Sequence, residues 1–342
     1  MTMSEITYEV VLEVLDGCGP SALAEARALG AVRTVGPTEL ILLASDLDAL
    51  RGLRRAVAAS LALTVPARRP RELLETSVQQ RLGGMLEAIR RQRPRQRFRG
   101  LRLEAAGAHT PDMLRLAAAL ADLAGIPVDE EDGDLVVRVR RGAQPGTWQV
   151  LLRITPRPLA TRAWRTVDYP GAVNATIAAT VLDRLEVTEE DAMLDMTCGS
   201  GTFLIEQLHE AAPARAVGVD LSAEALEAAR AHQRAARRRG RIDWLEGDVR
   251  TLEIAPGFTR LVTNPPWGTL HGEHESNEQL LADLLDRAAQ LAAPRARLGV
   301  LTHEITRMHR VLEDAPAGWR PAGEHRFFQK GHHPRLFLLE RG

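Results

Sequence analysis

The second half of the chain alternates short apolar runs with helical patterns, and four of these runs each end in an acidic or amide residue. Residues 192–194 lead into Asp195, residues 216–219 into Asp220, residues 242–247 into Asp248, and residues 261–263 into Asn264. Short apolar runs separated by helices predict an α/β fold with a parallel sheet. Because ligands bind at the carboxyl ends of such strands, the four polar groups are predicted to share one site.

The first half predicts strands and helices with no catalytic constellation. Strands are expected at residues 6–15, 40–43, 101–105, 135–139 and 148–154, and helices at 20–29, from 47 onward, at 68–97 and at 113–124. Asp46 is expected to cap the second of these helices, and Thr110 and Pro111 to begin the last. A helix at 277–291, a strand at 297–301 and a hairpin at 324–340 are expected to complete the second half.

Length and composition narrow the class of protein. A chain of 342 residues predicts two or three domains. No apolar stretch approaches the roughly 20 residues of a membrane helix, and residues 1–11 lack the pattern of a signal peptide, so a cytoplasmic location is expected. The two cysteines, Cys18 and Cys198, lie in no metal-ligand spacing, and no metal is expected.

Positive charge is concentrated in one stretch, although the net charge is -1. From Arg54 to Arg102 there are 13 arginines against three glutamates, a local balance of +10. The candidates for RNA contact are Arg91, Arg93, Arg95, Arg97 and Arg99. Such a run suits a polyanionic partner, or it is a solvated helix face in a chain whose only lysine is Lys330.

The glycines after Asp195 predict a tight loop that lets the backbone approach a ligand. Gly199 and Gly201 can turn sharply, and the N–H groups of the helix that follows favour a negative group. A dinucleotide fingerprint would need a third glycine at Leu204, and no Gly-Lys pair of a phosphate-binding loop follows. A nucleoside-like ligand remains, with its ribose held by Asp220.

The tetrapeptide Asn264-Pro265-Pro266-Trp267 predicts a site for a planar NH2 group. The amide oxygen of Asn264 and a backbone carbonyl held by two prolines provide two acceptors for the two hydrogens. The flat ring of Trp267 offers a surface on which a base stacks, worth roughly 1–3 kcal/mol in nucleic-acid binders.

Together these motifs resemble those of the class I amino-methyltransferases that use S-adenosylmethionine, over residues 169–342. Residues 98–165 resemble the THUMP domain, an RNA-binding module, through Arg102-Leu103-Glu104, residues 135–139 and residues 159–165. The whole chain is similar to the THUMP-containing guanine-N2 methyltransferases that modify the acceptor stem of tRNA, with rRNA relatives close behind. Two departures are Met196, where the family has proline, and Trp267, where Tyr, Phe or His is commoner.

The resemblance implies a ferredoxin-like domain at residues 1–60, a THUMP-like domain at 61–165 and a Rossmann-like methyltransferase domain at 166–342. It also assigns roles to two groups of residues. The cofactor-binding group is Asp195, Thr197, Cys198, Gly199, Ser200, Gly201, Thr202, Asp220, Leu221, Asp248, Val249 and Asn264, and the catalytic group is Asn264, Pro265, Pro266 and Trp267. In particular, Asp195 would orient the ammonium of S-adenosylmethionine, and Asp248 would accept from its adenine amine.

Several alternatives remain open from the sequence. The acceptor could be guanine N2 or adenine N6, in tRNA or rRNA. The same Asn-Pro-Pro-aromatic tetrapeptide also appears in DNA adenine and protein glutamine methyltransferases, and the THUMP-like basic module argues for RNA. A non-catalytic RNA-binding protein is the remaining class, which the intact Asp220, Asp248 and Asn264 disfavour. The oligomeric state is not predicted.

Overall fold

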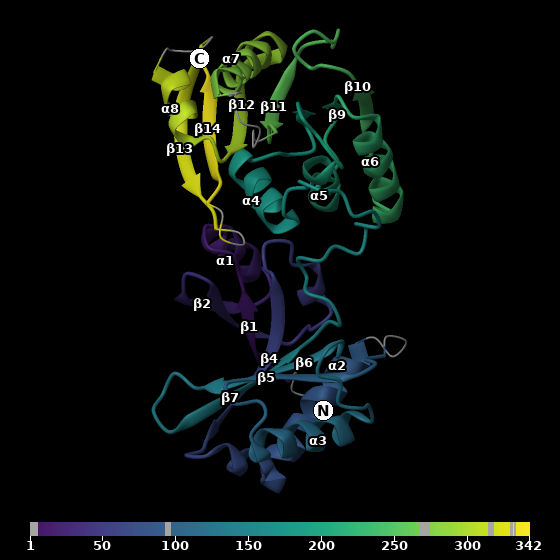
Figure 1. Cartoon of the computed structure of the whole chain (residues 1–342), viewed down its shortest axis with the longest axis vertical. Coiled ribbons are helices and arrows are strands. Elements are labelled where there is room, and N and C mark those ends of the chain that lie inside the picture. Colours follow the sequence, from purple (N-terminus) through teal and green to yellow (C-terminus); the bar gives the residue numbers. More distant parts are fainter. Residues whose placement is uncertain (1–5, 93–96, 267–273, 314–317, 329–330, 332) are drawn as a thin grey trace, which may run out of the picture. The chain divides into compact units, whose positions relative to one another are not determined.

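The computed structural model describes residues 6–92, 97–266, 274–313, 318–328, 331 and 333–342, which belong to two units (Figure 1). Unit 1 comprises Met1–Val14 and Ala22–Ala160, and unit 2 comprises Leu15–Ser21 and Thr161–Gly342. The expected start of the methyltransferase domain at residue 166 therefore lies five residues after the start of the long segment of unit 2.

Unit 1 contains a seven-stranded sheet in the order β2-β3-β1-β4-β7-β6-β5. Its strands are β1 (Tyr8–Glu13), β2 (Ala31–Gly36), β3 (Glu39–Ala44), β4 (Ala58–Pro66), β5 (Leu101–Ala105), β6 (Leu135–Arg141) and β7 (Thr147–Arg153). All neighbours pair antiparallel except β5 and β6, which are parallel. Strands of the two expected N-terminal domains thus share one sheet.

The helices of unit 1 follow local signals in the sequence. They are α1 (Gly19–Arg27), α2 (Thr76–Gln92) and α3 (Pro111–Ala124), with short 3-10 turns at Ala49–Gly52 and Pro70–Leu74. Thr110 and Pro111 begin α3 as expected, and Gly125 ends it with a φ of 59°. Asp46 accepts hydrogen bonds from the backbone of Asp48 and Ala49, but the helix expected from residue 47 is only the 3-10 turn Ala49–Gly52, whose N-cap is Asp48.

Unit 1 differs from the expectations at three points. The strands β2 and β4 were not predicted, since β2 is largely exposed and the sequence of β4 is rich in alanine. The helix expected at 68–97 begins only at Thr76, after the separate 3-10 turn. The expected boundary after residue 60 falls within β4, which pairs with β1 on one side and β7 on the other.

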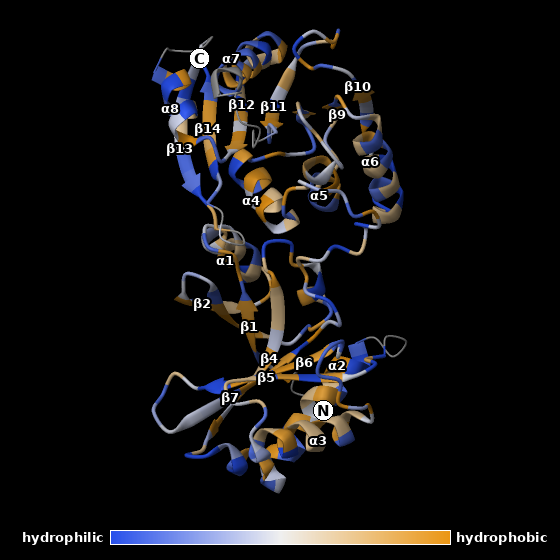
Figure 2. Ribbon diagram, viewed as in Figure 1, coloured by the Kyte–Doolittle hydropathy of each residue, from blue (hydrophilic) through white to orange (hydrophobic). Residues whose placement is uncertain are grey.

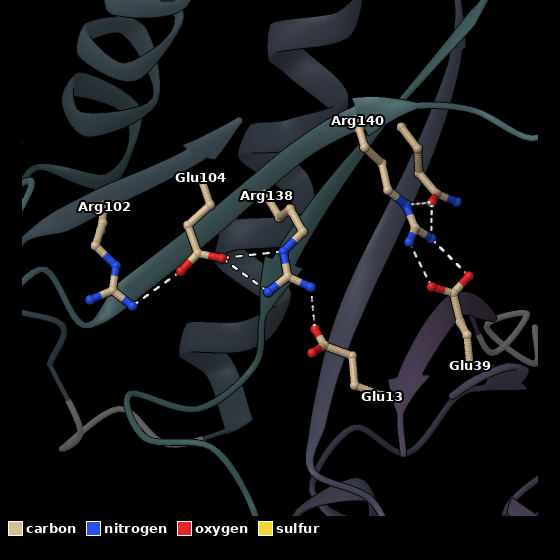
Figure 3. A network of polar contacts seen from close by, with 7 residues as sticks. Glu13, Glu39, Arg102, Glu104, Arg138 and Arg140 are labelled. Carbon is tan, nitrogen blue, oxygen red and sulfur yellow. Dashed lines mark hydrogen bonds and ion pairs between the residues drawn. The ribbon is translucent and has the colours of Figure 1, made fainter. Parts of the chain in front are cut away.

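Arginines of β6 are paired with acidic residues of other strands in unit 1 (Figure 3). The guanidinium of Arg138 bonds Glu13 of β1 at 2.8 Å and Glu104 of β5 at 3.0 Å. Arg140 binds both carboxylate oxygens of Glu39 in β3, at 2.6 and 2.8 Å. The contacts with Glu13 and Glu39 connect strands that are not adjacent, and the charge of both arginines is compensated within the unit.

Unit 2 contains a second seven-stranded sheet, in the order β10-β9-β8-β11-β12-β14-β13. Its strands are β8 (Ala192–Asp195), β9 (Arg215–Asp220), β10 (Asp243–Glu246), β11 (Phe258–Thr263), β12 (Ala292–Thr302), β13 (Trp319–Arg326) and β14 (Arg335–Arg341). The first five are parallel, and β14 inserts antiparallel between β12 and β13. The α/β methyltransferase fold class and the C-terminal hairpin expected from the sequence are confirmed.

Helices cover both faces of this sheet. They are α4 (Ala175–Leu185), α5 (Thr202–Glu210), α6 (Ala223–Ala236), α7 (His274–Leu291) and α8 (Ile305–Glu313). The core on one face includes α4 and α5, and the core on the other face includes α7 and α8. In Figure 2 the apolar colouring is strong in the central strands, which are buried by helices on both sides.

The strand order places the site within unit 2. From β8 the chain moves outward through β9 and β10, and then returns to the other side of β8 with β11 and β12. The loops after β8 and β11 therefore lie side by side at the point where the strand order reverses, which is where open α/β sheets bind ligands. Among the described residues, no helix is both long and apolar enough to cross a membrane.

A buried ion pair joins the segment before α4 to helix α5. Arg162 bonds both carboxylate oxygens of Glu206 in α5, at 2.9 and 3.2 Å, and the two side chains are 2% and 1% exposed. Removing one partner of such a pair leaves the other charge buried without compensation.

We expect Glu206→Gln to lower the free energy of unfolding by about 3 kcal/mol or more, because Arg162 keeps its charge while losing a charged partner. Chemical denaturation measures this change. Glu227→Gln, on the exposed side of α6, is the control, with an expected change of about 0.5 kcal/mol or less. Equal effects of the two substitutions would contradict a structural role for the buried pair.

Candidate active site

The loop after β8 is hydrogen-bonded through its backbone to both neighbouring strands. The N–H of Met196 donates to Val262 of β11 at 2.9 Å, and the N–H of Cys198 donates to Val219 of β9 at 2.8 Å. The N–H of Gly199 donates to the carboxylate of Asp220 at 2.7 Å. The loop is therefore held from both sides, although Met196 stands where the resembling family has proline.

Thr197 links this loop to Asn264. Its hydroxyl lies 2.9 Å from the hydroxyl of Thr263 and accepts a hydrogen bond from the backbone N–H of Asn264 at 3.1 Å. Thr263 is 1% exposed, so water does not compete for this contact. The side chain predicted to bind cofactor thus also fixes the backbone of the residue predicted to bind the substrate amine.

The two glycines of the loop serve different purposes. Gly199 has a φ of 52°, and a Cβ there would meet nothing closer than the Tyr169 ring at 4.0 Å, so its backbone is open to a ligand. Gly201 has a φ of 80°, and a Cβ there would lie 2.5 Å from the indole of Trp244. A Cβ on Gly218 would also meet that indole, at 2.6 Å. Gly201 is therefore required for packing by Trp244, which the sequence did not indicate.

A cavity of about 870 Å³ opens beside this loop. The predicted residues that line it are Thr197, Cys198, Gly199, Ser200, Thr202, Asp220, Leu221, Asp248, Val249, Asn264, Pro265 and Pro266. Asp195 and Gly201 are not among its lining residues, and Trp267 lies outside the described residues. The structure thus gathers residues from four separate strand ends around one space.

Asp195 lies behind the cavity wall. It is 0% exposed, and neither carboxylate oxygen has a hydrogen-bond partner among the described residues. Burial raises the pKa of this carboxyl well above its usual value, and the nearby Asp220 adds to the rise. The sequence predicts that Asp195 orients the cofactor's ammonium through a hydrogen bond or a water, and the structure places its carboxylate outside the lining of the cavity.

The other two carboxylates are held in different ways. Asp220 accepts one backbone hydrogen bond on each oxygen, from Gly199 at 2.7 Å and from Ser222 at 2.9 Å. Each oxygen retains capacity for a further donor. Asp248 instead bonds the Arg250 guanidinium at 2.6 Å, and this contact lowers the pKa of its carboxyl. Asp220 is fixed and available, whereas Asp248 shares its acceptors with Arg250.

The loop after β11 presents an acceptor without a partner. The side-chain oxygen of Asn264 is buried and has no hydrogen bond among the described residues. Pro265 is buried, Pro266 is exposed, and both line the cavity with Asn264. A buried acceptor without a partner is costly unless a ligand supplies the donor.

One wall of the cavity was not predicted as part of the site. It consists of residues 169–173, which precede α4. Arg165 holds this segment, because its guanidinium donates to the backbone of Val173 and to the hydroxyl of Thr202, both at 2.9 Å. His232, which is 0% exposed, contacts the Ser200 carbonyl at 3.1 Å and the Val167 backbone through its other ring nitrogen. No residue type in this segment indicated a binding role, and only the fold brings it to the loop.

Further lining residues also come from the fold alone. Met196, Phe203, Gly247, Arg250, Asn277, Leu280 and Leu284 complete the cavity. The leucines lie on α7, four residues apart, a spacing that in the sequence indicates only an amphipathic helix.

These groups fit a nucleoside-like cofactor. The cavity lies within the roughly 300–1,000 Å³ range of small-molecule sites. Asp220 has free acceptor capacity for ribose hydroxyls, and Val249 and Leu280 provide apolar surface for a base. The buried side-chain oxygen of Asn264, unpaired among the described residues, points to a ligand that carries hydrogen-bond donors. Among the described residues, no group of three or more His, Cys, Asp or Glu side chains is arranged to hold a metal ion.

The arginines predicted to bind RNA differ in their surroundings. Arg91 and Arg97 are exposed, whereas Arg99 pairs with Asp134 at 3.3 Å. Arg93 and Arg95 lie outside the described residues. Part of the charge in the basic stretch is thus already compensated within unit 1.

Solved structures with similar folds cover nearly the whole chain. The crystal structure of TrmN from Thermus thermophilus superimposes with a TM-score of 0.76 and 22% sequence identity, over 98% of this chain and 100% of that chain. A putative methyltransferase, SMU.472, complexed with SAH, has a TM-score of 0.69 and 14% identity, over 99% of each chain. At these identities the likeness establishes the fold.

Curated relatives match in sequence over shorter regions. The ribosomal RNA large subunit methyltransferase K/L of Acinetobacter baylyi is 26% identical over 227 residues, 52% of this chain and 30% of that protein. The tRNA (guanine(10)-N2)-dimethyltransferase of Methanothermobacter thermautotrophicus is 29% identical over 127 residues, 36% of each. The release factor glutamine methyltransferase of Caulobacter vibrioides is 32% identical over 122 residues, 36% of this chain and 39% of that protein. The matches span only 30 to 39% of these relatives.

The family comparison covers the cavity and the sheet that carries it. Residues 162–335, half of the chain, match the family model described as RMKL-like, methyltransferase domain. S-adenosylmethionine is the cofactor of this class I methyltransferase fold. With its glycine loop, its Asn-Pro-Pro segment and this match, the chain belongs to the UPF0020 family of RMKL-like methyltransferase domains.

Proposed function

We propose that the protein methylates the exocyclic N2 amine of a guanosine in tRNA, in the acceptor stem, with S-adenosylmethionine as the methyl donor. One observation carries the proposal. The buried oxygen of Asn264 has no partner among the described residues, and it lines the same cavity as the glycine loop. The name of the Methanothermobacter relative, a guanine-N2 enzyme of tRNA, supports the choice of acceptor.

The cofactor's place follows from the groups that line the cavity. Asp220 would accept hydrogen bonds from the ribose hydroxyls, since each of its oxygens has one backbone donor and room for another. Gly199 would let the loop backbone approach the methionine part, with Cys198, Ser200 and Thr202 beside it. Val249 would pack on the adenine, and Leu221 would lie nearby.

The cofactor-binding roles expected for Asp248 and Asp195 are adjusted to the contacts that these residues make. Asp248 would accept from the adenine amine only through the acceptor capacity that Arg250 leaves free. Asp195 would act on the cofactor's ammonium through the loop or through a water, because its carboxylate does not line the cavity.

Asn264 would make the amine reactive by orienting it. The cofactor supplies an electrophilic methyl group. A guanine N2 lone pair is delocalised into the ring and is a poor nucleophile until the hydrogens of the amine are held. Asn264 Oδ1 and the Pro265 carbonyl would accept those hydrogens, direct the lone pair at the methyl group, and stabilise the positive charge that develops on nitrogen. The product amine loses its proton readily, so no strong base is needed.

The base must leave its stack to reach this cavity, at a cost of a few kcal/mol. Trp267 would offset part of that cost by stacking on it, as the sequence suggests. Unit 1 would hold the surrounding RNA, with a ferredoxin-like part at residues 1–60 and a THUMP-like part at 61–165. The exposed Arg91 and Arg97 would contact phosphates there.

Other acceptors are distinguished by one experiment. Labelled methyl transfer from S-adenosylmethionine would be measured on unmodified tRNA, rRNA, DNA and protein, with nucleoside digestion of the acceptor that takes label. N2-methylguanosine from tRNA is the expected product. Label in rRNA would favour the activity named for the Acinetobacter relative, and N6-methyladenosine would indicate another base. Label in protein would favour the activity named for the Caulobacter relative, and no transfer would favour a non-catalytic RNA-binding protein.

Asn264→Ala is expected to lower kcat by roughly 100- to 1,000-fold, as for the loss of one preorganised group at a developing charge. Binding of S-adenosylmethionine, measured by calorimetry, is expected to stay within about threefold of wild type, a difference below about 0.7 kcal/mol. Wild-type turnover in this variant would remove Asn264 from the mechanism.

Thr197→Val is expected to lower kcat by roughly tenfold, because the backbone N–H of Asn264 loses its acceptor and the residue is no longer fixed. Thr197→Ser keeps the hydroxyl and is expected to restore most of the rate. Steady-state kinetics and cofactor binding are measured for both variants. A loss of cofactor affinity with unchanged kcat would show that Thr197 serves the cofactor alone.

Charge reversal at Arg95 and Arg97 is expected to weaken tRNA binding and to lessen its dependence on salt, because fewer counterions are released from the RNA. Binding is measured over a range of salt concentrations. Charge reversal at Arg33 and Arg157, two exposed arginines elsewhere in unit 1, changes the net charge equally and is the control. Equal losses in both variants would indicate an effect of net charge and not a defined contact.

A further inference from the structure

Helix α6 and the loop that follows it carry a second concentration of arginines, in the methyltransferase unit itself. Residues 230–241 include six arginines, all exposed: Arg230, Arg234, Arg237, Arg238, Arg239 and Arg241. No acidic residue occurs between Arg230 and Arg241. Hydrophilic colouring recurs along this helix in Figure 2. None of these side chains belongs to the wall of the 870 Å³ cavity.

Four of these arginines have no acidic partner within ion-pair distance among the described residues. They are Arg230, Arg234, Arg237 and Arg239, here called the α6 arginine surface. Arg241 pairs with Asp243 at 2.8 Å, and Arg238 donates to a ring nitrogen of His209.

Elsewhere in unit 2 the pattern is different. Arg250, Arg297 and Arg310 each have an acidic partner. Isolated exposed arginines without an acidic partner in the described part of the chain do occur, such as Arg295 and Arg320, whereas the α6 surface gathers four of them within residues 230–239.

Helix electrostatics explain only part of this cluster. Positive side chains in the last turn of a helix interact favourably with its carboxyl end, which accounts for Arg234 and for Arg237 at the cap. The effect falls off within one turn, so it does not explain Arg230, nor Arg239 beyond the end of the helix.

The position of α6 connects this surface to the site. The helix begins at Ser222, two residues after Asp220, and runs away from the carboxyl edge of the sheet for about 20 Å. Arg230 and Arg234 line a hollow of about 430 Å³ with Tyr169, which also lines the main cavity, and with the acidic Asp168, Glu224 and Glu227. The arginine surface thus begins beside the cavity and continues past the carboxyl end of α6, where no acidic residue lies between Arg230 and Arg241.

We propose that the α6 arginine surface binds the sugar-phosphate backbone of the RNA substrate beyond the target nucleotide. The inference rests on the proposed function and adds a second RNA contact, within unit 2. Guanidinium groups pair with phosphate oxygens in bidentate geometry, and such contacts position a nucleic acid without reading its sequence. An acidic protein is the less suitable partner, because protein interfaces have an apolar centre, and the outward residues of this helix after Arg230 are polar.

The test compares two variants of the full chain that lose the same charge. Arg234→Gln/Arg239→Gln removes two members of the surface and spares Arg237, whose φ is positive, and Arg230, which lies nearest the cavity wall. Arg320→Gln/Arg326→Gln is the control, with two exposed arginines on β13, at the far edge of the sheet. Binding of a full-length tRNA transcript is measured over a range of salt concentrations, together with methyl transfer and binding of S-adenosylmethionine.

The α6 variant is expected to bind tRNA roughly tenfold more weakly at low salt, with a slope of log affinity against log salt that is smaller by about 1.4 to 1.8 for two lost phosphate contacts. The KM for full-length tRNA is expected to rise in the α6 variant alone. Affinity for S-adenosylmethionine is expected to be unchanged in both variants.

Two results would overturn the inference while the proposed function stands. One is a wild-type salt slope in the α6 variant, when the wild-type protein binds and methylates tRNA. The other is binding of poly-glutamate as tight as that of tRNA and equally sensitive to the α6 substitutions, which would assign the surface to an acidic protein. If the wild-type protein methylates no RNA but binds it through α6, the proposed reaction is wrong and the RNA-binding role of the α6 arginine surface still holds.

Discussion

The hydrogen bonds that hold the loop after β8 between its two neighbouring strands are the constraint on which the site depends. Met196 is bonded to β11, Cys198 to β9, and the Thr197 hydroxyl to the backbone of Asn264. Because residues 196 and 197 are bonded on the β11 side and residue 198 on the β9 side, the loop cannot shift toward one strand without breaking bonds to the other. The cofactor loop and the Asn-Pro-Pro loop are consequently fixed relative to each other before any ligand binds, which is the preorganisation that transfer between two bound molecules requires.

Polar groups around the cavity differ in how much of their hydrogen-bonding capacity is already used by other protein groups. Asp220 has a backbone donor on each oxygen, Asp248 has Arg250, and the Asn264 oxygen has no partner among the described residues. The most completely satisfied carboxylates suit orientation of a cofactor, whereas the unsatisfied amide suits a ligand group that arrives with its own hydrogens. Asp195 is wholly buried, and burial raises the pKa of its carboxyl because the charged form is poorly solvated there.

Arginine serves three purposes in this chain, which its sequence alone does not separate. Arg138 and Arg140 connect strands of unit 1 through glutamates, and Arg162 and Arg165 fasten the wall of the cavity. Others, such as Arg97 and the arginines of the α6 surface, are exposed without a paired acid among the described residues. A count of charges along the sequence overstates the basic stretch of unit 1 and overlooks the surface on α6, because pairing depends on residues that are distant in the chain.

The sequence by itself determined the α/β methyltransferase class, the parallel strands of unit 2 and most of the cavity's polar groups, because each lies at the end of a short apolar run or beside a glycine. It predicted the pairing of neither β2 nor β4, whose apolar patterns are weak. Only the tertiary structure showed that Gly201 makes room for Trp244, that Asp195 is covered, and that residues 169–173 form a wall. Those features depend on side chains that meet across the sheet, and local spacing carries no information about such contacts.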